Sequence, residues 1–353
     1  MKKKLRGALL GAGQVTQYHL QAWSQIEEAE IVAIYNRTLE RGQERARQFG
    51  IPQERVYGDY ERLLDNHQLD FVDVASAPVA HRVQVQAAAR RGLHVLCQKP
   101  LATSMQEART MAETCRQAGV LLSVNENWRW RSWYRHVKEV LDRDEIGRPH
   151  YFRFYKHTDI VLRGPQGAPP HLLTKQPYTS EMDKLIVFEG GTHLIDVLRF
   201  LGGEIRSVHA RMDRLNADFK GEDRALMSFG LKGAMGVIDI SWSTVSGPSR
   251  RSGPDSQLER VAIEGEYGTL ELLPERGDTL RVSTKEACWE RPAVELPPME
   301  AYQASYTAAQ RHFVKCLLAG VEPETSAADN LKTLAVTFAA YRSAASDQVV
   351  SLE

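Results

Sequence analysis

The 353-residue chain is poor in cysteine, and its positive and negative charges cancel. Its four cysteines lie far apart, with no C-x-x-C pair; they are Cys97, Cys115, Cys288 and Cys316. This spacing is typical of reduced thiols in a cytosolic protein. A formal net charge of zero provides no general attraction toward nucleic acid or an anionic membrane surface. We therefore expect neither nucleic acid nor membrane as a partner.

The sequence also lacks a long apolar run at its start and a cluster with metal-ligand spacing. The first residues, Met1-Lys2-Lys3-Lys4-Leu5, superficially resemble the n-region of a signal peptide. The apolar run that follows stops at Gly11-Ala12-Gly13, which makes it too short to span a membrane and better explained as a first β-strand. No set of histidines, cysteines and carboxylates has the spacing of a zinc site, so we expect no metal. We expect a cytoplasmic protein.

The chain is long enough for two domains, and its first third alternates short apolar runs with segments of helical spacing. The predicted strands are 5–10, 31–35, 71–75, 94–97 and 120–124, and the predicted helices are 14–25, 39–49, 79–91 and 104–118. Alternation of this kind indicates parallel β-α-β units with right-handed crossovers. We therefore predict a doubly wound, Rossmann-type α/β domain over residues 1–125.

The pattern changes in the remaining part, residues 126–353. A predicted helix at 132–143 and a strand at 150–155 precede a long Pro- and Gly-rich loop over 160–184 and a helix at 190–201. Further strands are predicted at 205–212, 224–229, 236–241, 258–264, 269–273 and 279–284, with an exposed loop over 245–257 and closing helices at 305–318 and 327–346. This pattern favours an α+β domain with a large, mostly antiparallel open sheet, in which the 157–184 and 245–257 segments shape the substrate pocket.

A dinucleotide fingerprint follows the first predicted strand. Gly11-Ala12-Gly13-Gln14-Val15-Thr16 opens the first helix, where Gly11 permits a tight turn and Gly13 lets the backbone approach a pyrophosphate. The third fingerprint position is Thr16 instead of Gly or Ala, so the motif depends on its place within a β-α-β unit. The alternative is a glycine turn without a ligand.

The second strand ends at Asn36, where an NAD site usually carries Asp or Glu. Asn36-Arg37-Thr38 and Arg41 can donate to a 2′-phosphate that a carboxylate would repel. This turn resembles the NADP-recognition turn of shikimate dehydrogenases. We therefore expect NADP to be favoured over NAD, the alternative being that the two arginines are solvated charges on a helix face.

Two further features carry chemistry. Gln98-Lys99-Pro100 follows a buried strand at the sheet edge where doubly wound domains bind ligands, and the lysine there can stabilise a developing alkoxide. The proline would hold this turn, through a cis bond in one interpretation. Glu189 and His193 lie one helical turn apart, as a general base and its orienting carboxylate would. The alternatives are a surface turn for Lys99 and, for the second feature, helix capping by Thr192 or Glu189.

These features together resemble the glucose-fructose oxidoreductase/inositol dehydrogenase (Gfo/Idh/MocA) family nearly from end to end. The matching residues are Gly11-Ala12-Gly13 with His19, Ala77-Pro78 with His81, Gln98-Lys99-Pro100, Asn127 with Arg129, and Glu189, Gly191, His193 and Asp196. The resemblance implies that Lys99 is catalytic, and that Glu189 and His193 line the substrate site and handle the proton. It also implies a homodimer or homotetramer formed through the C-terminal sheet.

The expected contacts follow from these motifs. The cofactor contacts are Gly11, Gly13, Gln14, Val15, Asn36, Arg37, Thr38, Arg41, Ser76, Pro78, His81, Gln98, Lys99, Pro100 and Asn127. The substrate contacts are Lys99, Asn127, Arg129, His157, Arg163, Glu189 and His193. Three positions depart from the family pattern, because Gln98 and Glu189 stand where Glu and Asp are usual and Val79 replaces an Asn.

The favoured hypothesis is an NAD(P)-dependent oxidoreductase that acts on a sugar, sugar derivative or cyclitol. Two alternatives remain: a non-catalytic NAD(P)-binding regulator of the same fold, and a hydrolase or lyase that retains its NAD. The intact Lys99 and His193 argue against the regulator.

Overall fold

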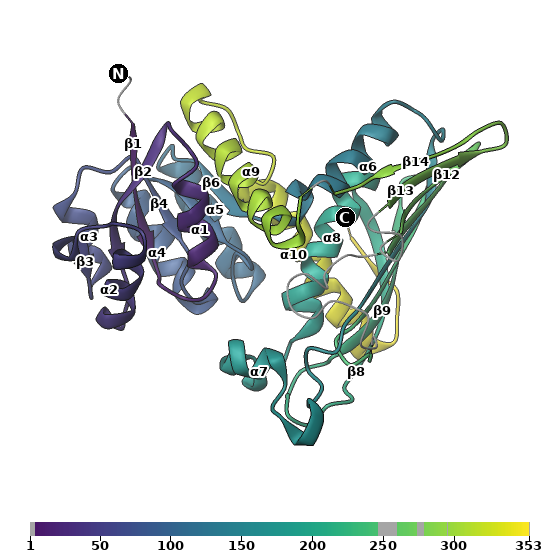
Figure 1. The fold of residues 1–353 in the computed structure, drawn as a ribbon, viewed down its shortest axis with the longest axis horizontal. Helices are drawn as coiled ribbons and strands as arrows, with labels where there is room; N and C mark the ends of the chain where they lie inside the picture. Colours follow the sequence, from purple (N-terminus) through teal and green to yellow (C-terminus); the bar gives the residue numbers. More distant parts are fainter. Residues whose placement is uncertain (1–3, 246–259, 274–278, 295, 353) are drawn as a thin grey trace. The chain divides into compact units, whose positions relative to one another are not determined.

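The structure is a computed structural model that describes residues 4–245, 260–273, 279–294 and 296–352 (Figure 1). Its contacts divide the chain into two compact units. The first is Met1–Trp130 with Gln303–Lys332, and the second is Arg131–Tyr302 with Thr333–Glu353. The division into 1–125 and 126–353 stays a prediction. The contacts also show that a C-terminal segment, Gln303–Lys332, belongs to the first unit.

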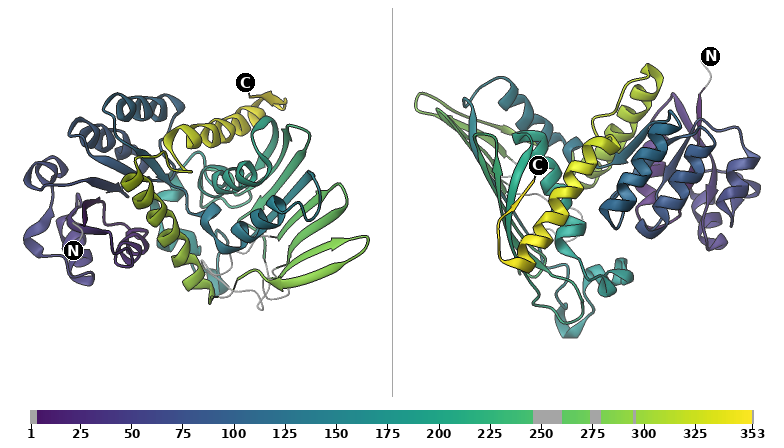
Figure 2. Two further views of the ribbon diagram at one scale, coloured as in Figure 1. Left: turned by 90° about the horizontal axis from the view of Figure 1, so that it is seen from above. Right: turned by 180° about the vertical axis from the view of Figure 1, so that it is seen from behind.

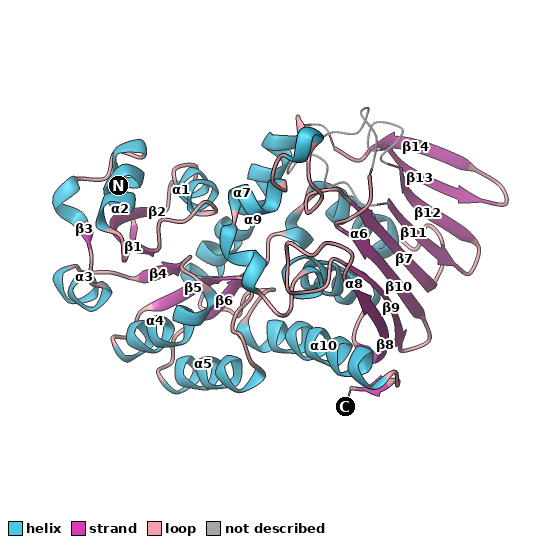
Figure 3. Ribbon diagram, turned by 90° about the horizontal axis from the view of Figure 1, so that it is seen from below, coloured by secondary structure: helices cyan, strands magenta, loops and turns pink. Residues whose placement is uncertain are grey.

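The first unit contains the predicted doubly wound sheet, with six parallel strands in the order β3-β2-β1-β4-β5-β6. Figure 3 shows helices on both faces of this sheet. Its elements are β1 (Leu5–Leu10), α1 (Thr16–Trp23), β2 (Ala29–Tyr35), α2 (Leu39–Gln48), η1 (Gln53–Arg55), β3 (Val56–Tyr57), α3 (Tyr60–Asn66), β4 (Phe71–Val74), α4 (Pro78–Arg90), β5 (His94–Gln98), α5 (Met105–Gln117), β6 (Leu122–Asn125) and η2 (Trp128–Trp130). Strand β3 and helix α3, which are short, were not predicted from the sequence.

The returning segment Gln303–Lys332 completes the core of this unit. It contains most of α9 (Pro298–Ala319) and the start of α10 (Ala327–Ser346). From α9, Phe313 packs edge-on against Phe71 of β4 and Tyr306 lies over the imidazole of His19. Burial of these aromatic rings explains why a segment so distant in sequence belongs to the first unit.

The second unit is built on a nine-stranded sheet in the order β14-β13-β12-β11-β7-β10-β9-β8-β15, which Figure 3 displays strand by strand. Every neighbouring pair is antiparallel except β7 with β10, as the prediction of a mostly antiparallel sheet requires. Its elements are α6 (Ser132–Asp142), β7 (Pro149–His157), η3 (Pro165–Gly167), α7 (His171–Lys175), η4 (Pro177–Glu181), η5 (Val187–Gly191), α8 (Thr192–Gly202), β8 (Ile205–Asp213), β9 (Arg224–Leu231), β10 (Met235–Ser241), β11 (Arg260–Gly265), β12 (Gly268–Leu273), β13 (Thr279–Thr284), β14 (Cys288–Pro292) and β15 (Val350–Ser351).

Helices of the second unit cover one face of this sheet (Figure 2). Strand β7 shows the reason, because Phe152, Phe154 and Lys156 alternate as buried residues with more exposed neighbours. Helix α8 packs on β7 and β10, and Leu198 occupies the space above Gly236. The opposite face carries the other alternate residues, including Tyr155, Leu226 and Met235, which are exposed.

The Pro- and Gly-rich stretch 160–184, predicted as a loop, contains three short helical turns, η3, α7 and η4. A proline begins or precedes each of them, because its fixed φ suits the first position of a helix. The predicted 245–257 loop lies outside the described residues from 246 onward. Within the described ranges, no helix is both long and apolar enough to cross a bilayer.

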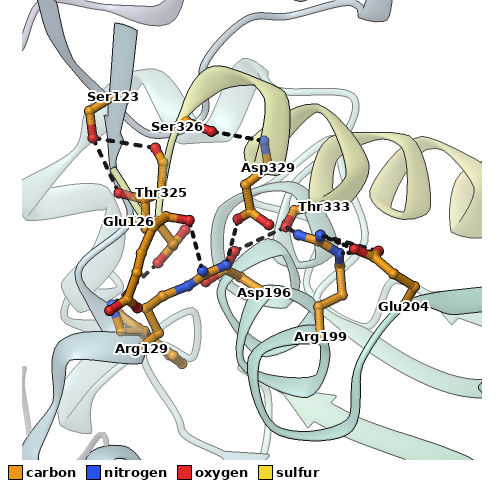
Figure 4. Close-up of polar contacts among 12 residues, drawn as sticks. Ser123, Glu126, Arg129, Asp196, Arg199, Glu204, Thr325, Ser326, Asp329 and Thr333 are labelled. Carbon is orange, nitrogen blue, oxygen red and sulfur yellow. Dashed lines mark hydrogen bonds and ion pairs between the residues drawn. The ribbon is translucent and has the colours of Figure 1, made fainter. Parts of the chain in front are cut away.

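A buried polar bridge joins α8 to α10 (Figure 4). The Thr333 hydroxyl donates to Asp196 over 3.0 Å and accepts a hydrogen bond of 2.7 Å from Arg199, whose guanidinium also pairs with Glu204. Asp196, Arg199 and Thr333 are all buried, so loss of the Thr333 hydroxyl removes one hydrogen bond from each of two buried charged side chains.

We predict that Thr333→Val lowers the free energy of unfolding by roughly 1–3 kcal/mol, the cost of unsatisfied buried groups. Thr110→Val is the matched control, because Thr110 is exposed on α5 and its hydroxyl, among the described residues, bonds to the Gln106 carbonyl of the same helix. The urea midpoint measures both variants. Equal midpoints for the two would contradict the prediction.

Candidate functional site

The glycine loop after β1 has the geometry of a dinucleotide turn. Gly11 has φ of +125°, and a Cβ there would lie 2.6 Å from the Ala75 carbonyl oxygen, so only glycine fits. A Cβ on Gly13 would meet no described atom within 4 Å. The backbone at Gly13 is therefore open to a ligand, as close approach of a pyrophosphate requires.

Thr16, the departure at the third fingerprint position, is fully buried at the start of α1. Its hydroxyl donates to the Gly13 carbonyl over 2.6 Å. The side chain thus closes the loop with a hydrogen bond, which a glycine or alanine at this position would lack.

A hollow of about 230 Å³ lies beside this loop. Its walls are Ala12, Gly13 and Gln14 on one side and one face of α2 on the other, formed by Arg41, Glu44, Arg45 and Gln48. The Asn36 side chain connects the two sides. Its Oδ1 accepts from the backbone amide of Ala12 at 3.0 Å, and its Nδ2 donates to the backbone carbonyl of Thr38 at 2.7 Å. Arg37 and Thr38 are exposed beside it, and Val15 is half-buried at the start of α1. These residues fit a dinucleotide, with open backbone for phosphate and guanidinium groups nearby.

His81 contacts the backbone of two loops, one after β4 and one after β5. It is fully buried on α4, with one ring nitrogen 3.1 Å from the Ser76 carbonyl oxygen and the other 3.1 Å from that of Leu101. Burial lowers the pKa of His81, so the neutral ring donates to only one of the two carbonyls. Pro78 occupies the first turn of α4, and Val79 is exposed next to it.

Lys99 follows β5 at the carboxyl edge of the sheet, and its bond to Pro100 is cis, as the sequence interpretation suggested. The backbone amide of Lys99 donates to Oε1 of the preceding Gln98 over 2.7 Å. Gln98 is buried, so this bond fixes the main chain from which the lysine side chain extends.

A fully buried network continues from Gln98. Its amide nitrogen lies 3.4 Å from Nε2 of His19, and the amide nitrogen of Asn125 lies 3.2 Å from the same atom. Nδ1 of His19 lies 2.8 Å from Asp73, which also accepts from Trp23 at 2.7 Å. Two amide donors at Nε2 and a carboxylate at Nδ1 favour the neutral Nδ1–H tautomer of His19.

Asn127 and Arg129, expected to contact ligands, bond within the first unit to the returning segment. Asn127 donates to the Ser305 hydroxyl over 2.7 Å. Arg129 pairs with Asp329 at 2.8 Å and donates to the Glu324 carbonyl, as Figure 4 shows for the aspartate. These bonds hold the returning helices, and ligand contact by either residue stays a prediction.

In the second unit, Glu189 and His193 lie on one continuous helical segment. A π-helical turn, η5, carries Glu189 and leads into α8, which carries His193. His193 is buried and Glu189 is half-buried. The helix starts upstream, where other residues bond the free amides of 185–188, so the interpretation of Glu189 as an N-terminal cap is wrong. A π-helical turn within an α-helix often marks a functional site.

Three further residues of the second unit were not among the predicted site residues. Lys156 is buried on the helix-covered face of β7, in register with Ile240, whose side chain packs beside Gly190. Thr158 is also buried, and its hydroxyl has no partner among the described residues. Tyr178 is exposed, and its hydroxyl donates to Oε1 of Gln176 at 2.8 Å. Lysine at an inward position of an alternating strand was the signal available for Lys156.

Two other expected substrate contacts have different surroundings. His157 belongs to the open face of the sheet, where it pairs with Asp239 at 2.8 Å and Tyr155 stacks on it. Arg163 is exposed and pairs with Asp218 at 2.8 Å. Neither contact joins Glu189 or His193. In the described part of the chain, no group of three or more His, Cys, Asp or Glu side chains is placed to hold a metal ion.

We predict that Gly13→Ala folds with the parent melting temperature but binds the dinucleotide at least about tenfold more weakly, because its methyl group occupies the ligand's space. Gly11→Ala should lose stability as well, since its Cβ meets the Ala75 carbonyl. Thermal melting and NADH or NADPH fluorescence titration measure both effects. Full affinity in Gly13→Ala would rule out this loop as the pyrophosphate site.

Comparison with known proteins agrees with this geometry. Residues 5–126 match the oxidoreductase family with an NAD-binding Rossmann fold, and residues 134–271 match the GFO/IDH/MocA C-terminal domain. D-apiose dehydrogenase of Paraburkholderia graminis is 36% identical over 99% of this chain and 90% of its own, and that of Rhizobium rhizogenes is 34% identical over 99% and 98%. The crystal structure of an oxidoreductase from Agrobacterium radiobacter in complex with NAD+, L-tartaric acid and magnesium superposes with a TM-score of 0.90 at 34% identity, covering 99% of this chain and 98% of that one. The chain belongs to the Gfo/Idh/MocA family of oxidoreductases.

Proposed function

We propose that this oxidoreductase transfers hydride between a nicotinamide dinucleotide and a carbinol carbon of a sugar or cyclitol. The observation that carries the proposal is the pairing, in one chain, of an open glycine loop with a lysine fixed at the sheet edge and an acid/base pair on a helix. Family membership and two relatives named D-apiose dehydrogenase support it.

Each chemical group has one task in this proposal. When bound, the nicotinamide accepts the hydride that leaves the carbinol carbon. Lys99 stabilises the negative charge that develops on the substrate oxygen. His193 accepts the hydroxyl proton, and Glu189 orients the imidazole or holds a second substrate hydroxyl. The overall step oxidises the alcohol to a carbonyl, reduces the nicotinamide and releases one proton to His193.

The proposed substrate class is a polyhydroxylated sugar close in chemistry to D-apiose. Lys156 adds an ammonium to the neighbourhood of the Glu189 segment, since it lies in register with Ile240, whose side chain packs beside Gly190, and this is in keeping with a ligand rich in hydroxyl groups. Asn127, Arg129, His157 and Arg163 remain proposed contacts of lower rank, because their observed partners are other protein groups.

The favoured cofactor in this proposal is NADP. Asn36 places no carboxylate at the end of β2, and Arg41 and Arg45 both line the hollow beside Gly13. A 2′-phosphate would gain from these cations, although Glu44 in the same hollow opposes it. Cofactor choice is therefore a balance that Arg41 decides.

We also propose that the protein is a homodimer or homotetramer formed through the open face of the nine-stranded sheet. Exposed Tyr155, Leu226 and Met235 share that face, and it carries no helix of the second unit. Aromatic and methionine side chains are enriched in protein interfaces. The cytoplasmic location expected from the sequence stays a prediction.

Lys99→Ala and His193→Ala should each lower turnover at least about a hundredfold while nucleotide affinity stays within a few-fold of the parent, because each removes a transition-state interaction. Reduction of NAD+ or NADP+, followed by absorbance over D-apiose, myo-inositol and further polyols, measures the effect. Lys232→Ala and His150→Ala are exposed controls.

The same panel separates the rival functions. Dinucleotide binding by the parent protein without turnover of any polyol would favour the regulator. Tightly held NAD that does not exchange, with no net reduction, would favour a hydrolase or lyase. Near-normal turnover in both Lys99→Ala and His193→Ala would contradict the proposed mechanism.

Arg41→Gln should weaken NADP binding about tenfold and leave NAD binding unchanged, because only the 2′-phosphate needs the added cation. Fluorescence titration of both dinucleotides with parent and variant measures this difference. Arg47→Gln is the control on the same helix, since Arg47 does not line the hollow. A strong preference of the parent protein for NAD would overturn the NADP proposal.

A further inference from the structure

The helix that carries Glu189 and His193 begins with four backbone amides that have no partner within the helix. Such amides occur at every helix start and are costly when buried. Here they belong to residues 185–188, which are all buried. Glu189 is the first residue whose amide bonds inside the segment, to the Leu185 carbonyl at 2.8 Å.

Two residues from distant parts of the second unit satisfy all four amides. The Glu222 carboxylate accepts from the amides of Leu185 and Val187 at 3.1 Å, and its backbone carbonyl accepts from Ile186 at 3.1 Å. The Tyr341 hydroxyl accepts from the Phe188 amide at 3.1 Å.

The two residues also bond each other. The Tyr341 hydroxyl donates a hydrogen bond to Oε1 of Glu222, the same oxygen that accepts from the amides of Leu185 and Val187. The phenol therefore donates one hydrogen bond and accepts one, and the carboxylate accepts from one side chain and two amides. Loss of the hydroxyl would leave both Glu222 and the Phe188 amide short of a partner.

The loop that brings Glu222 to the helix is shaped for this contact. A Cβ at the preceding Gly221 would lie 2.7 Å from the Met182 carbonyl oxygen and 2.9 Å from the Leu185 nitrogen. Only glycine allows this approach. Glu222 is 8% exposed, and burial raises the pKa of its carboxyl while the bonds from Tyr341 and the helix amides oppose that rise.

Helix α10 also holds the π-helical turn at its other end. Thr192, the residue after that turn, places its hydroxyl 3.2 Å from the hydroxyl of Thr337. Thr337 and Tyr341 are four residues apart on α10, hence on one face of the helix. Glu189 lies between these two points of attachment, and His193 follows directly after the second.

We propose that Glu222 and Tyr341 are positioning residues that hold the helix start so that Glu189 and His193 stand ready for proton transfer. This inference rests on the proposed function, because the two residues position the acid/base pair of that reaction. Their hydrogen bonds fix the backbone from which the Glu189 and His193 side chains extend, and neither Glu222 nor Tyr341 needs to touch the substrate.

The test replaces Tyr341 with Phe in the full-length protein. We expect turnover of D-apiose to fall about 10- to 100-fold, since small misplacements of catalytic groups are costly, with the dinucleotide Kd changed less than twofold. Amide hydrogen exchange over residues 185–193 should accelerate. Tyr267→Phe is the matched control, because its hydroxyl donates to the carboxylate of Asp144 at 3.0 Å on an exposed surface.

Glu222→Gln and Glu222→Ala keep the test decisive if one variant folds poorly. Glutamine retains one acceptor oxygen, so it should keep more turnover than alanine at equal fraction folded. A merely structural role predicts faster exchange and a lower melting temperature with parental turnover per folded molecule, and that result would overturn the proposal. Unchanged exchange would overturn it as well.

Turnover by the parent protein tests the proposed function separately from the positioning role. A parent that reduces no dinucleotide with D-apiose or any polyol of the panel refutes the oxidoreductase reaction, and the positioning role fails with it. A parent that turns over, beside a Tyr341→Phe variant that turns over equally, refutes only the positioning role.

Discussion

A backbone amide that leaves regular structure at a buried turn needs an acceptor, and this requirement organises the chemistry of the protein. At three positions beside the proposed site residues the acceptor is a side-chain oxygen. Asn36 accepts from Ala12 at the glycine loop, Gln98 from Lys99 at the sheet edge, and Glu222 from Leu185 and Val187 at the helix start. Each bond fixes the main chain next to a group that the proposed reaction uses, so the same bond satisfies a backbone amide and positions that group.

The substitution at Gln98 becomes intelligible in these terms. A glutamate there could accept the same Lys99 amide, but its carboxylate has no proton to offer the nearby His19. The glutamine amide faces Nε2 of His19 and leaves the opposite ring nitrogen to donate to Asp73. The amide at position 98 therefore suits a hydrogen bond to His19 in this buried network, and the turn at Lys99 is kept with one negative charge fewer.

The elements of the first unit were predictable because its buried strands are short apolar runs and its helices have clear spacing. β3 and α3 were missed because two residues of strand and seven of helix carry too little pattern. The turns of the 160–184 stretch were missed for a related reason, since Pro and Gly indicate a loop unless the φ of each proline is known.

The proposed site residues divide in the same way. Lys99, Glu189 and His193 could be proposed from the sequence because their motifs are local, and their roles stay predictions. Glu222 could not, because it lies 37 residues from the amide of Leu185 that it serves, and nothing in Gly221-Glu222-Asp223 indicates a helix that starts so far upstream. His157, a predicted substrate contact, pairs with Asp239 on the open face of the sheet, and its contact with a ligand stays a prediction.

Each unit fixes its own part of the chemistry with its own bonds, and this has a consequence for how substitutions act. The glycine loop, the Asn36 bridge and the Gln98–Lys99 turn lie within the first unit, whereas the start of the Glu189 helix is bonded by Glu222 and Tyr341 within the second. A substitution in either set therefore first disturbs the bonds of its own unit. Nucleotide affinity should respond most directly to the first set and proton transfer to the second. Helix α10 is an element that the two units share, since Arg129 of the first unit bonds Asp329 near its start, while Thr333 and Tyr341 further along it bond residues of the second.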